Sequence, residues 1–313
     1  MDVRDVLPRD AIPNIDDPAF EAMYFGGPDD EVVVVEGTPA RAYPLRILGS
    51  HEVVNDTVDG QPLAVTWCPI CWSAVVYDRT VEGRTLTFGV SGTLADDALV
   101  LYDRETESEW QQTTGAAISG EFEGRQLTAL PSQVLSWERF ADEYPGGVVL
   151  QPPDGEAPHA ASARYDMAPY EAYREREEFG LYGMRGQGDQ REWDRDDDIG
   201  PKTVVLGIEA DDDAMAYPLS RARAVGGLVT DIVGDCDVVV VADDEGIRAF
   251  ENPGYDFERP QQDLHADGTA WHPVTGESDD GRRLDPVPAR QLFAFAWQDA
   301  HGDAFYSATS STS

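Results

Sequence analysis

A Cys-Pro-Ile-Cys motif, with a histidine upstream of it, is the part of this sequence whose residue types could do chemistry. The motif holds Cys68 and Cys71, and the histidine is His51. Thiolate and imidazole groups are common ligands of zinc, copper and iron. Two thiols at this spacing can also form and break a disulfide, and a buried cysteine can be no more than a small apolar residue of the core. The motif therefore raises three hypotheses.

The residues that flank the motif favour metal ligation over a thioredoxin-like site. The run LAVTWC (63–68) ends at Cys68, the first residue of the motif, and the valine-rich run SAVVYD (73–78) follows the motif. In a thioredoxin-like site the motif opens a helix, whose N-terminus lowers the pKa of the first thiol. A strand on each side is typical of a metal knuckle, in which the turn amides point at the sulfurs.

The cysteine count limits the metal hypothesis. The chain has three cysteines, and the third, Cys236, belongs to no second Cys-x-x-Cys motif. A closed zinc site of four cysteines is therefore excluded. We expect Cys68, Cys71 and His51 to hold a zinc, copper or iron ion, with one further position open to water or substrate.

Polar residues that follow His51 are candidates for the groups that keep these ligands in place. They are Glu52, Asn55 and Asp56, and such supporting groups orient the ligands of most metal sites. Asn55 and Asp56 could instead cap a turn. In the redox hypothesis the cysteine pair cycles through a disulfide and His51 is the base. In the third hypothesis the cysteines are structural, and the protein is a non-catalytic binding or scaffolding module.

The elements that must position these residues are mostly strands. Runs with alternating or continuous apolar residues are separated by turn signals such as Asp-Gly at 59–60, which predicts strands and turns. A helix is expected over 132–144, after Pro131, with Ser132 as its cap. A shorter helix is expected from Pro44 towards His51. The fold class is therefore α+β with strands dominant.

An ordered series of matches indicates two degenerate repeats of one unit, which we expect to be related by a pseudo-twofold axis. The first repeat spans 31–150 and carries the Cys/His site; the second spans 202–306. The matching pairs are AYPL (42–45, 216–219), VVNDTV with LVTDIV (53–58, 228–233), EWQQTTG with AWHPVTG (109–115, 270–276) and GRQL with GRRL (124–127, 281–284). The second repeat has Val225 and Asp-Asp-Glu-Gly where His51 and the motif would fall. This asymmetry favours a function confined to the first repeat.

The rest of the chain is expected to surround the repeats. Residues 1–30 form an N-terminal extension, 151–201 a polar connecting excursion that its aromatic residues should keep ordered, and 307–313 a flexible tail.

Charge limits the partners and the setting. The chain has 60 Asp and Glu residues against 23 Lys and Arg, a net charge of −37, so nucleic acid and anionic membranes are excluded as partners. The partner is expected to be a small molecule or a protein. The acidic residues are spread along the chain, which is typical of adaptation to concentrated salt. The N-terminal residues show no signal peptide and no stretch reaches the length of a membrane span, so we expect a cytoplasmic protein of a high-salt cell.

A long first-repeat segment resembles a known family. The residues that carry the resemblance are 40–79, followed by LTFGVSG (86–92), LYDRETESEW (101–110) and TGAAISGEFEGRQL (114–127). They are similar to the uncharacterised family called domain of unknown function 3179, and the similarity extends over nearly the whole chain. Its usual pattern of His-Glu, Asn-Asp and Cys-Pro-x-Cys is matched by His51, Glu52, Asn55, Asp56, Cys68, Pro69 and Cys71. The resemblance implies where the site lies and implies no activity.

Overall fold

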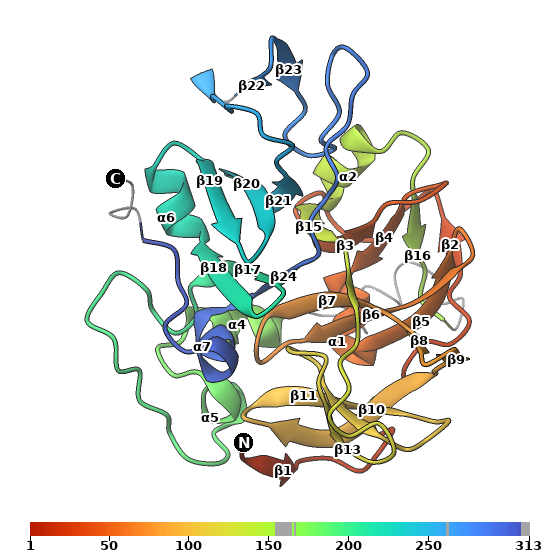
Figure 1. Ribbon diagram of the computed structural model, residues 1–313. Helices are drawn as coiled ribbons and strands as arrows, with labels where there is room; N and C mark the ends of the chain where they lie inside the picture. Colours follow the sequence, from red (N-terminus) through yellow and green to blue (C-terminus); the bar gives the residue numbers. More distant parts are fainter. Residues whose placement is uncertain (154–164, 166, 261–262, 308–313) are drawn as a thin grey trace.

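The computed structural model describes residues 1–153, 165, 167–260 and 263–307 (Figure 1). Strands make up most of its regular structure and the helices are short, which confirms the α+β, strand-dominated class. None of the described helices is long and apolar enough to cross a membrane. Of the tail expected at 307–313, all but Ser307 lies outside the described residues.

The central sheet contains strands from both halves of the chain. Its order is β18-β17-β24-β7-β6-β5, and β14 also pairs with β7. Gln291 of the second half lies opposite Ala74 of the first, so the two halves share one sheet. The strands are β5 (Val53–Val58), β6 (Gln61–Cys68), β7 (Ser73–Asp78), β14 (Ala129–Leu130), β17 (Val204–Ala210), β18 (Asp213–Pro218) and β24 (Ala289–Phe293).

Smaller sheets surround the central one, and the N-terminal segment supplies strands to two of them. One sheet contains β1 (Val3–Asp5), β10 (Phe88–Ala95), β11 (Ala98–Asp103), β12 (Glu109–Gln111) and β13 (Ala117–Ser119). Another contains β15 (Gln133–Ser136), β3 (Glu31–Val35), β4 (Arg41–Pro44), β16 (Val148–Leu150) and β2 (Phe20–Glu21). The remaining strands are β19 (Leu228–Val233), β20 (Cys236–Asp243) and β21 (Gly246–Glu251), and the pairs β8 (Thr80–Val81) with β9 (Arg84–Thr85) and β22 (Leu264–Ala266) with β23 (Thr269–Trp271).

The helix expected over 132–144 is shorter than predicted. Its first residues form the strand β15, which pairs with β3, and α2 begins only at Trp137 (Trp137–Glu143). The cap is Ser136, whose hydroxyl accepts a hydrogen bond from the Arg139 amide at 3.1 Å, and not Ser132. Pairing with β3 therefore outweighs the local helical pattern.

The short helix α1 (Leu45–His51) lies where the sequence predicts it, after Pro44. Leu45, Ile47 and Leu48 are buried. The helix ends because Glu52 adopts the left-handed conformation, with φ of 58°, and donates its amide to the Leu48 oxygen at 2.7 Å.

The connecting excursion contains two short helices, α4 (Ala168–Glu175) and α5 (Gly180–Arg185), which pack beside α7 (Ala294–His301) (Figure 1). Phe179 lies 5.2 Å from Phe295, ring centre to ring centre. Lys202, the only lysine in the chain, donates to the Tyr173 carbonyl at 2.6 Å and lies 4.6 Å from the centre of that residue's ring. These contacts tie the excursion to the second half.

The two halves show the same order of elements. The first runs β3, β4, α1, β5, β6, β7, and the second runs β17, β18, α6 (Leu219–Ala224), β19, β20, β21. Tyr43 donates its hydroxyl to Asp56 at 2.5 Å, and Tyr217 donates to Asp231 at 3.0 Å. In the first half the carboxylate also accepts from Arg41, at 2.5 and 2.6 Å.

These two tyrosine–aspartate pairs differ in burial, so they should differ in energy. Asp56 is only 7% exposed, and Asp56→Asn leaves the Arg41 charge without its partner, which should lower the free energy of unfolding by about 3 kcal/mol. Asp231 is half-buried, so the matched Asp231→Asn should cost about 1 kcal/mol or less. Urea unfolding at one fixed salt concentration measures both. Equal losses would contradict this assignment.

Candidate functional site

The Cys-Pro-Ile-Cys turn lies in the interior of the molecule. Every residue from Leu63 to Tyr77, which includes the turn between β6 and β7, is buried. A buried turn must satisfy its backbone polar groups inside the protein. The Tyr173 hydroxyl of α4 donates to the Ile70 oxygen at 2.9 Å, and the Phe293 amide at the end of β24 donates to the Cys71 oxygen at 2.8 Å. The excursion and the second half thus hold the turn in place.

A cavity of about 340 Å³ lies next to this turn, and we call it the Cys68 cavity. Cys68 and Glu52 line it from the first half, and Arg185 lines it from the end of α5. Most of the remaining wall is apolar and includes Leu7 of the N-terminal segment and Leu181 of α5. Both cysteines of the turn are free thiols, but Cys71 does not line the cavity.

The electrostatic surroundings of the two thiols differ. Burial raises the pKa of Cys68, but hydrogen bonds from the Cys71 thiol and from the amides of Cys71, Leu99 and Ile70 outweigh it and lower the pKa overall. Burial also raises the pKa of Cys71, and the neighbouring Cys68 sulfur raises it further. The Cys71 thiol has a second acceptor, the Asp97 oxygen at 3.6 Å, but an ionised Cys68 is the stronger one. Of the two thiols, Cys68 therefore ionises more readily.

Glu52 places a carboxyl group beside this thiol. The left-handed backbone at Glu52 turns its side chain into the Cys68 cavity, and its carbonyl accepts the Trp67 amide at 2.8 Å. Burial, together with the negative charge at Cys68, raises the pKa of Glu52 to about 8, although Arg185 acts in the opposite direction. At neutral pH the carboxyl is thus mostly protonated, and it lies next to the thiol whose pKa is lowered.

His51 faces other groups. Its Nδ1 lies 2.6 Å from the Pro13 carbonyl and its Nε2 lies 3.0 Å from the Tyr165 hydroxyl. Because a carbonyl can only accept, Nδ1 carries a proton, and Nε2 is occupied by its hydrogen bond with the Tyr165 hydroxyl. Neither nitrogen is then left to bind an ion or to take the proton of Cys68.

Asn55 and Asp56 also hold the fold together. The Asn55 side chain donates to the Phe88 oxygen at 2.8 Å and accepts the Phe88 amide at 3.0 Å, as a neighbouring strand would. Asp56 binds Arg41 and Tyr43. Neither residue lines the Cys68 cavity.

The expected set of two cysteines and His51 is therefore not assembled. Across residues 1–153, 165, 167–260 and 263–307 no three His, Cys, Asp or Glu side chains are grouped to hold a metal ion. Of the expected residues, the structure brings Cys68, Cys71 and Glu52 together.

The comparisons bear on this site through the family. The family model described as "Protein of unknown function (DUF3179)" matches residues 9–306. The chain belongs to this family. The match confirms the resemblance seen in the sequence and covers nearly the whole chain. No curated protein and no solved structure matches it, so the function of this DUF3179 protein has to be argued from its geometry.

Sequence reasoning missed the part of the site that comes from the excursion. Arg185, Leu181 and Met184 line the Cys68 cavity from α5, more than a hundred residues after the motif. The only sequence signal was the aromatic content of 151–201, which predicted that this segment is ordered but not where it packs. Glu52 was expected behind a ligand, whereas it faces the cavity itself.

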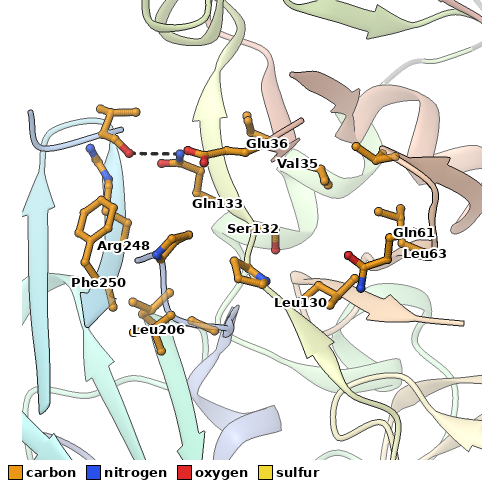
Figure 2. Close-up of a pocket in the computed structure, with 18 of the residues that line it drawn as sticks. Val35, Glu36, Gln61, Leu63, Leu130, Ser132, Gln133, Leu206, Arg248 and Phe250 are labelled. Atoms are coloured by element: carbon orange, nitrogen blue, oxygen red, sulfur yellow. Dashed lines mark hydrogen bonds between the residues drawn. The ribbon is translucent and has the colours of Figure 1, made fainter. Parts of the chain in front are cut away.

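A second cavity, of about 270 Å³, lies between the two halves (Figure 2). Leu206 and Phe250 of the second half and Leu63 of the first belong to its mainly apolar wall. Arg248 beside them is paired with Asp243 at 2.8 Å. The described residues that line this cavity include no cysteine and no histidine. It has room for an apolar molecule, whereas Cys68 and Glu52 line the Cys68 cavity.

The raised pKa of Glu52 should make stability depend on pH. In the unfolded chain the carboxyl ionises near its usual pKa of about 4.3, but in the fold it keeps its proton up to about pH 8. The folded state therefore binds more protons between these values, and stability falls as pH rises through that window. Glu52→Gln should flatten this fall and gain roughly 3–5 kcal/mol over the native chain at pH 8.

Urea unfolding from pH 5 to 8.5 measures this difference, with Glu123→Gln, at an exposed glutamate, as the control. The control should follow the native curve. If Glu52→Gln also follows it, Glu52 is not held protonated.

Proposed function

We propose that this DUF3179 protein is a thiol–disulfide redox protein in which Cys68 is the nucleophile, Cys71 the second thiol and Glu52 the proton donor. The observation that carries the proposal is that Cys68 faces the Cys68 cavity, next to a carboxyl that stays protonated at neutral pH, while Cys71 is buried behind it. A lowered thiol pKa with a second thiol nearby is the arrangement that disulfide exchange requires. The sequence gave His51 the role of base, whereas here Glu52 acts as an acid.

The reaction has two steps. The Cys68 thiolate attacks one sulfur of a small disulfide, which forms a mixed disulfide and expels a thiolate that takes the Glu52 proton. Cys71 then attacks the Cys68 sulfur, and its proton leaves with the second expelled thiolate. The small disulfide has become two thiols, the protein holds a Cys68–Cys71 disulfide, and Glu52 is left ionised until water returns its proton.

The cysteine variants test this sequence of steps. With bis(2-hydroxyethyl) disulfide, the native chain should release two thiols per molecule. Cys71→Ser should release one thiol and keep a mixed disulfide at Cys68, and Cys68→Ser should release none. Cys236→Ser is the control, because this half-buried cysteine lies outside the site, and it should match the native chain. Intact mass and thiol release measure the products.

A transition-metal centre at the cysteine pair, with zinc, copper or iron, is the second proposal. The observation that favours it is the set of turn amides directed at the Cys68 sulfur, which knuckle sites share. Stoichiometric metal in protein purified without chelator, lost in both Cys68→Ser and Cys71→Ser, together with no thiol release, would replace the redox proposal by this one. A binding or scaffolding module predicts neither metal nor thiol release.

We also propose that the two halves are copies of one unit. The shared order of elements, the proline before α1 and α6, and the two tyrosine–aspartate pairs support this origin. The turn between β20 and β21, which takes the place of the Cys-Pro-Ile-Cys turn, has no cysteine. Only the first copy then carries out chemistry.

We further propose that the protein works in the cytoplasm of a high-salt cell and acts on a small molecule. The net charge of −37 supports the first point, because self-repulsion of this size needs screening. The size of the Cys68 cavity, about 340 Å³, supports the second, since it suits a small ligand.

The salt proposal makes a prediction for stability. Raising KCl from about 0.1 M to about 3 M should raise the unfolding temperature by more than 10 °C, because the Debye length falls from about 10 Å to less than 3 Å. Calorimetry or circular dichroism measures the transition. Sucrose at equal osmolality is the control, since it is excluded from the protein surface, as salt can be, but does not screen charges. An unfolding temperature that does not change with KCl would remove the salt argument.

A further inference from the structure

We propose that the substrate of the Cys68 cavity is a small disulfide that carries a carboxylate on an apolar chain, and that Arg185 binds this carboxylate. The inference rests on the proposed thiol–disulfide function and adds the substrate class and the residue that selects it.

Arg185 is a cation without an ion-pair partner in the described part of the chain. It is exposed, it lines the Cys68 cavity, and it makes no ion pair or hydrogen bond with any described residue. Other arginines near this region are paired: Arg191 binds Asp299 at 2.6 Å and Arg4 binds Asp2 at 2.6 Å. An electrostatic partner of Arg185 is the Glu52 carboxyl, which is mostly protonated at neutral pH, so the guanidinium is able to bind an anion from solution.

The location of Arg185 gives the cavity two different ends. Cys68 and Glu52 are buried in the wall, while Arg185 is exposed, so we place Arg185 where the cavity opens and the other two at its inner end. Between them the wall is apolar, with side chains such as Leu94 and Met184. A ligand that fits this order has a sulfur at one end, a short apolar chain, and an anionic group at the other.

A carboxylate suits Arg185 because the planar guanidinium can donate two parallel hydrogen bonds to it. Three hydroxyl residues also line the wall. Tyr170 donates to the Gly49 oxygen at 2.7 Å and Thr93 to Asp5 at 3.1 Å, and the third, Ser50, carries no charge, so Arg185 is the one cation on the described wall. The acidic surface elsewhere repels anions. Selection of an anionic substrate therefore depends on Arg185.

A structural explanation of Arg185 is also available, since it ends α5 and a cation is favourable at a helix C-terminus. Arg223 provides the matched control. It lies in the last turn of α6 and is exposed, and it does not line the Cys68 cavity. Arg223→Gln and Arg185→Gln remove the same charge from the last turn of a short helix, so they change the net charge of the protein equally. Arg223 also donates to the Asp243 carbonyl at 2.6 Å, a contact outside the Cys68 cavity.

The experiment compares a charged and a neutral disulfide. In a Cys236→Ser background, the rate constant of thiol release is measured with 4,4′-dithiodibutyrate and with bis(2-hydroxyethyl) disulfide, at one salt concentration. The ratio of the two rate constants reports recognition of the carboxylate, whereas a change in the Cys68 thiolate affects both reagents alike. Arg185→Gln should lower the ratio about tenfold, the loss of one charge-assisted contact. Arg223→Gln should leave the ratio unchanged.

The outcomes separate the two proposals. A ratio that is the same in Arg185→Gln and in Arg223→Gln, while Cys68 still reacts, overturns the carboxylate proposal and leaves the redox function standing. A ratio that Arg185→Lys restores only in part supports two-point binding of the carboxylate by the guanidinium. No reaction of Cys68 with either disulfide overturns the redox function and the substrate proposal together.

Discussion

The site depends on a turn that is buried and therefore cannot leave its backbone oxygens to water. The Ile70 oxygen is satisfied by Tyr173 and the Cys71 oxygen by the Phe293 amide. If either donor were missing, a buried carbonyl would lack a partner, which would lower the free energy of unfolding by about 1–3 kcal/mol. One donor comes from the excursion and the other from the second half, so a first half alone could not hold its own cysteines in place. The second half thus helps to hold the two cysteines in place, although its own corresponding turn has no cysteine.

The same burial explains the charge distribution. An apolar cavity in the protein interior does not stabilise two adjacent negative charges, so ionisation of Cys68 or Glu52 raises the pKa of the other. Backbone amides lower the pKa of Cys68, whereas no described residue donates a hydrogen bond to the Glu52 carboxyl. Of the two groups, the sulfur is therefore the one whose charge the backbone favours. An acid next to a nucleophile is a consequence of how the turn is built.

The sequence predicted those features that depend on local pattern. The strands around the motif and the helix from Pro44 to His51 follow from apolar periodicity and from proline. The start of α2 was missed because β15 forms by pairing with β3, a contact distant in sequence. The choice between His51 and Glu52 was also beyond local pattern. The two are adjacent, and a left-handed backbone at Glu52, rare for a residue other than glycine, decides which of them faces the Cys68 cavity.

Backbone strain at the site supports a functional role for Glu52. A non-glycine residue in the left-handed region costs of order 1 kcal/mol, and Trp72, directly after the second cysteine, has a φ of 50° as well. The Trp72 ring is held against Trp67 and Phe293, with ring centres 5.2 and 5.7 Å away, so its strain is offset by packing. The Glu52 backbone is offset as well, because its amide donates to the Leu48 oxygen at 2.7 Å and its carbonyl accepts the Trp67 amide at 2.8 Å, but its carboxyl is buried without a hydrogen bond from the described residues. Ending a helix does not require a buried acid at this position, whereas the proposed disulfide exchange would use its proton.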